Sequence, residues 1–363
     1  MSQKRSFEDT HSVKKLCNRV SVLSNEHGEN KEFSTRKRCS SVSYEQCSSY
    51  KKMKLQEIED EVIVKREENT KQLTPTKNVE ENIAHTSDKP RLLPALLLNG
   101  NLSSVIKIDE QKYNIYNTCA FDSIAIIISR AFVDNSAYTD FVDANSNSEF
   151  LNFCKSVAFI DSSENLNKQR VKMLRRIFNE NSEAPNLKTI NCECNVIKII
   201  CDLLKEYPSA KNHIRCSNNS CKNANTWRNS STIILDVKEL KDLKNLEGIL
   251  KEYTKLRKYN CGRCTEKITA KRALSNHLFI ETDQLKKTSQ FTMADIPSEI
   301  SVENYRFVLN GSVNFESGHY TSQVLRLKQN VWETHNDLRK YIKICTVPEK
   351  LIVNPHLVVY TKE

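Results

Sequence analysis

Two pairs of cysteines, 40 residues apart, constrain the fold of this chain more than any other feature. Cys216 and Cys221 are separated by four residues, and Cys261 and Cys264 are separated by two. Pairs at this spacing supply the four thiolates that a tetrahedral zinc ion requires. Gly262 suits the sharp backbone turn between two ligands. The spacing therefore predicts a Zn²⁺ site, and a structural one, because four thiolates leave no open position for a water.

The rest of the composition indicates that these thiols are reduced. The chain has 363 residues and 13 cysteines, and it begins MSQKRSFEDT, which is charged and lacks the apolar segment of a secretory signal. We therefore expect an intracellular protein, nuclear or cytoplasmic, whose cysteines are metal ligands, a nucleophile or small core residues. Only six glycines are present, with neither a GxGxxG nor a GxxxxGK[ST] loop for phosphates. No run of about 18 apolar residues predicts a membrane span.

The first 90 residues differ from the rest. They carry 17 basic and 15 acidic side chains, so eight of the chain's ten net positive charges belong to 91–363. Because 1–90 has no sustained apolar period, we predict a disordered polar tail followed by a folded domain over 91–363. Basic clusters at 36–38 and 51–54 are either a nuclear import signal or ordinary tail charge. The balance of 91–363 permits an acidic partner without requiring one.

Within 91–363, helical patterns come first and strand patterns later. This order predicts an α+β fold with segregated halves. The segment 119–132, CAFDSIAIIISRAF, is apolar on nearly every face and predicts a helix buried at the domain centre. Further helices are expected over 165–180 and 195–206, and strands over 232–237, 277–281, 305–310, 320–327 and 357–361.

A candidate nucleophile stands at the start of the buried helix. Cys119 would lie in its first turn, where backbone N–H groups and the helix dipole favour an anion and so a thiolate. Those N–H groups, with a nearby Asn side chain, can stabilise an oxyanion. The alternative is a small buried residue without a chemical role.

A candidate base follows 200 residues later. Gly318 and His319 precede a strand, and Asn336 and Asp337 follow Trp332 in the next one. A catalytic cysteine needs an imidazole to take its proton, and the imidazole needs an acceptor on its other nitrogen. Adjacent strands could supply both groups. The alternative is a structural histidine and an Asn-Asp turn.

Taken together, the order of these elements resembles the ubiquitin-specific protease family, the papain-like deubiquitinases. The resemblance covers about 91–363 and rests on three separated motifs in the family's order. It implies a papain-like cysteine protease fold with a helical thumb, zinc-ribbon fingers at approximately 210–270 and a β-rich palm. It also implies a thiol-dependent hydrolase that cleaves isopeptide bonds at the C-terminal glycine of a modifier.

Each motif residue has a counterpart in the family. Cys119 matches the nucleophile and His319 the general base, while Asn336 falls where the family orients the histidine. Asp337 aligns with the acidic residue that follows, and Asn114 with the oxyanion Asn five residues before the cysteine. The resemblance places the four zinc cysteines in the fingers.

Three departures bear on the substrate. Asp122 stands where the family usually has Asn, although a related SUMO-directed isopeptidase also carries Asp there. The family's Gln-Gln-Asp-Ala segment is absent, and 190–195 takes its place. The first zinc pair has four intervening residues instead of two. We therefore expect the partner to be ubiquitin or a ubiquitin-like modifier, SUMO included.

Two other functions remain open from the sequence. One is a catalytically inactive, zinc-stabilised module that binds modifiers. The other is a nucleic-acid-binding zinc protein, which predicts aromatic residues among the basic ones near the cysteines. Only Tyr253 and Tyr259 lie among the basic residues near the cysteines, so nucleic acid is the least expected partner.

Overall fold

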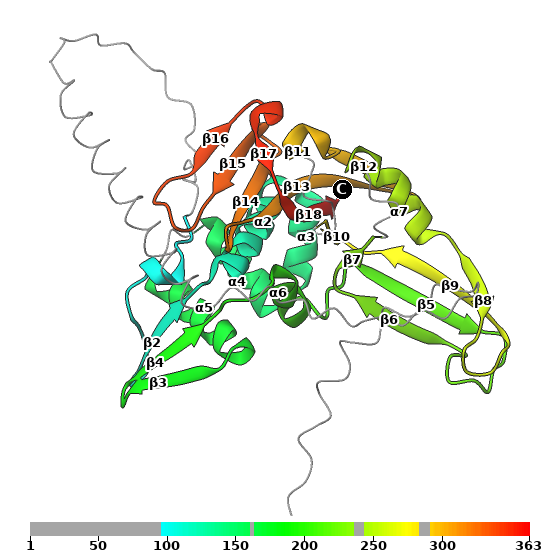
Figure 1. The fold of residues 1–363 in the computed structure, drawn as a ribbon, viewed down its shortest axis with the longest axis horizontal. Helices are drawn as coiled ribbons and strands as arrows, with labels where there is room; N and C mark the ends of the chain where they lie inside the picture. The colour runs from blue at the N-terminus through cyan, green and yellow to red at the C-terminus, as the bar shows by residue number, and fades with distance from the viewer. Residues whose placement is uncertain (1–95, 160–162, 236–242, 283–290) are drawn as a thin grey trace, which may run out of the picture. The chain divides into compact units, whose positions relative to one another are not determined.

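The computed structural model describes residues 96–159, 163–235, 243–282 and 291–363. All of them fall within one compact unit, Glu80–Glu363. The predicted tail 1–90 and its two basic clusters lie outside the described residues. Within them the chain is a mixture of helices and sheets, in agreement with the mixed class expected from the sequence (Figure 1).

An eight-stranded sheet forms the centre of this unit. Its order is β16-β15-β14-β13-β18-β10-β7, with β12 paired to β13, and every pair is antiparallel except β10 with β7. The strands are β7 (Ile233–Ile234), β10 (His277–Glu281), β12 (Glu299–Val302), β13 (Tyr305–Glu316), β14 (His319–Arg326), β15 (Val331–His335), β16 (Lys343–Cys345) and β18 (Pro355–Lys362).

Both faces of β18 are buried, which explains its unbroken apolar run. Leu357 and Val359 join the core beneath the helices. Val358 and Tyr360 join a second core on the opposite face. A strand covered on both sides cannot alternate apolar with polar residues, so the sequence reads as continuous hydrophobic residues. The expected strands at 277–281, 305–310, 320–327 and 357–361 correspond to β10, β13, β14 and β18.

Helix α2 (Cys119–Asp134) covers one face of the central sheet. It packs against β14 and α4, and all but two of its 16 residues are buried. The expected buried helix at 119–132 is therefore present and extends two residues further. The other helices are α3 (Ser136–Ala144), α4 (Glu149–Phe159), α5 (Glu164–Ile177), α6 (Val196–Leu203) and α7 (Leu246–Thr254). Among the described residues, no helix is both long and apolar enough to cross a bilayer.

A four-stranded sheet lies among the helices in the sequence, so the two classes of element are not fully segregated. Its order is β1-β2-β4-β3, with β2 and β4 parallel. One strand of this sheet, β2, immediately precedes α2 in the sequence and leads the chain to Cys119. The strands are β1 (Ile106–Ile108), β2 (Gln111–Tyr116), β3 (Glu180–Ala184) and β4 (Leu187–Asn191).

Short elements complete the described chain. β11 and β17 form a two-stranded sheet. These strands are β11 (Phe291–Thr292) and β17 (Ile352–Val353). The 3₁₀ helices are Gly100–Leu102, Leu243–Asn245, Met293–Asp295 and Pro348–Lys350.

A separate antiparallel sheet, here called the cysteine sheet, has the order β6-β5-β9-β8 (Figure 1). Its strands are β5 (Ala210–Cys216), β6 (Thr226–Ser230), β8 (Arg257–Asn260) and β9 (Lys267–Leu274). A small apolar cluster, which includes Ile214, Ile268 and Cys216, lies against one face. The expected strand at 232–237 is reduced to β7, and its residues 236–237 lie outside the described residues.

Candidate active site

The backbone at the start of α2 presents Cys119 in the first helical turn. Asn117 has a φ of 59°, which turns the chain sharply between β2 and the helix. The Thr118 hydroxyl does not cap the helix; it accepts from the Gly100 N–H at 2.8 Å and donates to Asp122 at 2.5 Å. The first-turn N–H groups beside the half-buried Cys119 therefore remain available to a negative charge.

A tight hairpin positions His319. Ser317 and Gly318 have φ values of 50° and 78°, and Glu316 pairs with His319 across the turn. Two consecutive residues with positive φ are the pattern of a type I′ turn, whose twist matches that of the flanking strands. His319 is therefore fixed as the first residue of β14, the strand against which α2 packs.

The structure brings four of the predicted site residues together. Nε2 of His319 lies 3.0 Å from Oδ1 of Asn336 and 3.2 Å from Oδ1 of Asp337. Cys119 lies near enough to the same ring to raise its pKa. Burial lowers the pKa of His319, but its contacts with Asp337 and Cys119 outweigh burial and raise the pKa to about 10. The imidazole is therefore held in its charged form by the Asp337 carboxylate and the Cys119 sulfur.

Asn99 anchors Asp337, although no local motif in the sequence marks Asn99 as a site residue. Nδ2 of Asn99 donates to Oδ2 of Asp337 at 2.7 Å, and the Asn99 N–H donates to the Asp337 carbonyl at 2.8 Å. Asn99 is buried and lies 238 residues away in the chain. These two bonds hold the Asp337 carboxylate against the His319 ring.

Asp122 belongs to the same buried network. Its Oδ1 accepts a hydrogen bond from Nη1 of Arg170 at 2.9 Å, and both side chains are almost fully buried. Burial raises the pKa of Asp122 to about 8; Arg170 opposes this shift and Asp337 adds to it. A protonated Asp122 carries one O–H donor and one carbonyl acceptor. It therefore offers the hydrogen-bonding groups of the Asn that the resembled family has at this position.

Asn114, the expected oxyanion residue, lies in β2. It is half-buried and pairs with Thr189 in the parallel ladder. Among the described residues, no recorded hydrogen bond joins it to Cys119 or His319. Its chemical role remains a prediction.

A second buried charge network joins α2 to the strands behind the site. Glu333 accepts from Arg130 at 3.2 Å, from Arg326 at 2.8 Å and contacts His335 at 2.8 Å. Burial opposes the charge of Glu333, but His335 and the arginines lower its pKa to about 2. Arg326 also pairs with Asp134 at the end of α2. These contacts fix α2 in register with β14 and β15.

The four paired cysteines converge at one end of the cysteine sheet. Their sulfur atoms all lie within 4.8 Å of one another, with Cys216 and Cys264 at 3.4 Å and Cys221 and Cys261 at 3.8 Å. Backbone N–H groups of Arg263 and Cys264 are the main groups that lower the pKa of Cys261 to about 6. Four converging sulfurs with donors that favour a thiolate fit a tetrahedral zinc ion. The predicted metal ligands thus form a possible Zn²⁺ site.

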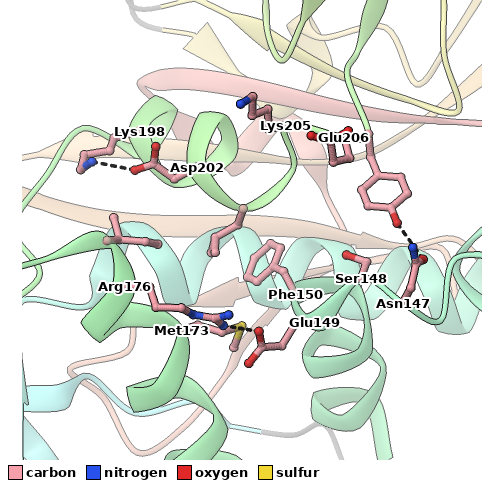
Figure 2. A pocket seen from close by; sticks show the side chains of 13 residues that line it. Asn147, Ser148, Glu149, Phe150, Met173, Arg176, Lys198, Asp202, Lys205 and Glu206 are labelled. Carbon is pink, nitrogen blue, oxygen red and sulfur yellow. Dashed lines mark hydrogen bonds and ion pairs between the residues drawn. The ribbon is translucent and has the colours of Figure 1, made fainter. Parts of the chain in front are cut away.

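One hollow of the described unit lies away from these residues (Figure 2). It has a volume of about 730 Å³ between α4, α5 and α6. Opposite charges are paired along its walls, Lys198 with Asp202 and Arg176 with Glu149. Neither Cys119 nor His319 lines it. The reacting groups are therefore not in this hollow.

Comparison with known proteins gives distant likenesses. No family model matches the chain. A 120.7 kDa protein in the NOF-FB transposable element of Drosophila melanogaster is 25% identical over 292 residues, which cover 74% of this chain. The match covers 27% of that protein, so the chain spans about a quarter of its length.

Among solved structures, the neighbours are SAGA DUB modules that contain Ubp8, Sgf11, Sus1 and Sgf73. One is 16% identical with a TM-score of 0.42, and the match covers 84% of this chain and 75% of that one. Another, bound to ubiquitin aldehyde, is 14% identical with a TM-score of 0.33 and coverages of 75% and 72%. TM-scores below 0.5 are too low to establish a shared fold. The chemistry of the chain is therefore argued from its own contacts.

Proposed function

We propose that residues 91–363 form a cysteine-type hydrolase that cleaves isopeptide bonds at the C-terminal glycine of ubiquitin or a ubiquitin-like modifier. The observation that carries this proposal is the contact of His319 with Asn336 and Asp337, together with the effect of the nearby Cys119 on the pKa of the same ring. A nucleophile, a base and an orienting acceptor in this arrangement are what thiol-dependent acyl transfer requires.

In the first half of the reaction, His319 already holds the proton that came from Cys119, and the Cys119 thiolate attacks the carbonyl carbon of the glycine. The carbonyl electron pair moves to oxygen, which accepts hydrogen bonds from the Cys119 N–H and the Asn114 amide. When the oxyanion collapses, the carbon–nitrogen bond breaks. His319 gives its proton to the departing lysine amine.

In the second half, His319 takes a proton from a water that attacks the thioester. The carbon–sulfur bond breaks, the proton returns to the Cys119 sulfur, and the modifier leaves with a free carboxylate. Asn336 and Asp337 keep the imidazole oriented through both halves. Asn99 and Asp122 act on the reaction by holding Asp337.

In this proposal the cysteine sheet is the fingers of a papain-like deubiquitinase fold, and its zinc is structural. Cys216, Cys221, Cys261 and Cys264 would hold the ion, which would supply stability and no reacting group. The central sheet corresponds to the palm, and α2 with α4 to α6 corresponds to the thumb. The tail 1–90 is proposed to lie outside this catalytic domain.

The test is covalent labelling with ubiquitin and SUMO probes that carry a C-terminal electrophile. We expect the wild type to gain the mass of one probe and Cys119→Ala to gain none. The identity of the reacting probe names the modifier. Labelling that persists in Cys119→Ala at the same rate would overturn the mechanism.

A second candidate is a zinc-stabilised module that binds modifiers without cleaving them. Its support is the cluster of four cysteines, which could hold a zinc ion that stabilises the cysteine sheet without taking part in a reaction. The contacts around His319 favour the enzyme, because a binding module does not need a charged imidazole beside a thiol. A folded, zinc-loaded protein that binds a modifier but reacts with no probe would support this second candidate.

A further inference from the structure

One face of the cysteine sheet is open and carries only positive charge. Antiparallel register places Lys211, Arg215, Lys258, Lys267 and Lys271 on the same side of the sheet. All five side chains are exposed. These residues, with His213 and Trp227, are here called the basic face.

The two faces of this sheet differ in what covers them. The opposite face holds the buried Ile214 and Ile268, and α7 packs over it, with Arg272 stacked on Tyr253 at 4.2 Å. On the basic face no residue is buried. The open side therefore has no role in the core of the described unit.

The sequences of β5, β6, β8 and β9 contain no Asp or Glu. Within the described ranges, only Lys271 of the five cations forms an ion pair, with Glu303 at 3.4 Å. Lys267 instead donates to the neutral Asn260 at 2.7 Å. The positive charge of the basic face is thus largely unneutralised by the described part of the chain.

A flat aromatic stack stands in this field. The rings of His213 and Trp227 lie 4.2 Å apart with an angle of 7° between their planes. The His213 ring is fixed by a 2.6 Å hydrogen bond to Asn225. Trp227 is 59% exposed and lies on the edge strand β6, so another flat ring can extend the stack.

We propose that the basic face binds single-stranded nucleic acid, with a base stacked on Trp227 and phosphates on the lysine and arginine side chains. Exposed aromatic rings within a positive surface are the usual means of holding unpaired bases. A phosphate backbone carries only negative charge, so it complements this positively charged face. This binding site is independent of the proposed hydrolase.

An acidic protein fits the same face less well. Protein interfaces have an apolar centre and are depleted in lysine. The basic face is rich in lysine, and apart from Trp227 its only apolar side chain is Ala273. From the sequence alone, nucleic acid is the least expected partner, because only Tyr253 and Tyr259 lie near the basic residues in the sequence. The strand register shows that Trp227 and His213 also lie among basic side chains.

The test uses the full chain and a fluorescein-labelled oligothymidylate of about 20 nucleotides, longer than the ~4–16 that such surfaces cover. The chain has two tryptophans, and Trp332 is buried. We expect the oligonucleotide to quench tryptophan emission in the wild type and not in Trp227→Phe. Trp227→Ala should weaken binding by about 5- to 150-fold in anisotropy titrations.

Charge variants provide a second readout. Substituting Gln for Lys211, Arg215 and Lys258 together should reduce the slope of log affinity against log salt by about 2 between ~50 and ~200 mM. The matched control substitutes Gln for the exposed Lys340, Lys343 and Lys350, and should leave the slope unchanged. Zinc content and circular dichroism verify that each variant is folded.

Three results would overturn the proposal. One is an unchanged affinity in folded Trp227→Ala. Another is equal binding of a duplex of the same length, since paired bases cannot stack on the ring. The third is displacement of the oligonucleotide by polyglutamate at an equal concentration of charge, which would assign the face to an acidic protein.

Discussion

The charge on His319 provides the sharpest test of the site, through the substitution Asp337→Asn. The substitution keeps the size of the side chain and removes its negative charge. The Asp337 carboxylate is the foremost group that raises the pKa of His319 to about 10, against the effect of burial. We therefore expect the pKa of His319 to fall in the variant.

The distance sets the size of the effect. At 3.2 Å and an effective dielectric constant of about 20, a charge pair interacts by about 5 kcal/mol. An amide dipole replaces part of that interaction, and the His319 side chain is 18% exposed, which weakens it further. Since one pKa unit is 1.36 kcal/mol, we expect a decrease of about one to three units.

Alkylation of Cys119 reports the charge of His319 without any substrate. Iodoacetate is an anion and is attracted by an imidazolium, whereas iodoacetamide is neutral. The ratio of their rates at the Cys119 peptide, followed by mass spectrometry, should fall as His319 loses its proton. We expect this fall near pH 10 in the wild type and at least one pH unit lower in Asp337→Asn.

The exposed Asp140 on α3 provides a matched control. Asp140→Asn should leave the midpoint of the rate ratio where it is in the wild type. If folded Asp337→Asn also keeps that midpoint, the carboxylate does not set the charge of His319, and the reasoning about the site is refuted.

Three further predictions concern stability. Cys264→Ser should lower bound zinc from one ion per chain toward none and lower the melting temperature, whereas Cys201→Ser on α6 should change neither; metal analysis and calorimetry measure both. The pKa of Asp122 is about 8 in the folded state and 3.8 ordinarily. Because the folded state binds this proton more tightly than the unfolded state, the free energy of unfolding falls as pH rises between these two values. The melting temperature of Asp122→Asn minus that of the wild type should therefore increase from pH 5 to pH 8. A difference that stays constant over this range would contradict the raised pKa. Gly311→Ala should cost about 2–4 kcal/mol in urea unfolding, because its Cβ would lie 2.2 Å from the Gln323 carbonyl oxygen, while Gly262→Ala, with no atom within 4 Å, should cost little.

Elements with a strong local pattern could be predicted from the sequence. The apolar run of α2 and the continuous hydrophobic residues of β18 follow directly from burial on every side. Helix α4 was missed, although its buried positions 150, 151, 153, 154, 157 and 158 repeat at helical spacing. Helix α3 has nine residues and only two fully buried ones, so its period is too weak to recognise.

The candidate site divides in the same way. Cys119, His319 and Asn336 each stand in a short motif, and the motifs alone suggested their proximity. Asn99 and Arg170 have no such motif, because they act through contacts with residues 238 and 48 positions away. Asp122 could be noticed in the sequence only as a departure from the resembled family, whereas its burial and its contact with Arg170 are visible only in the structure.

The position of β18 in the central sheet has a consequence for synthesis. It lies between β13 and β10, yet it follows all the other described strands in the sequence. Until 355–362 leaves the ribosome, β13 and β10 have no common neighbour, and β14 cannot present His319 to α2 on a completed sheet. Such long-range pairing is slow to form. A nascent chain would therefore carry Cys119 without a working base until β18 has been synthesised and inserted between β13 and β10.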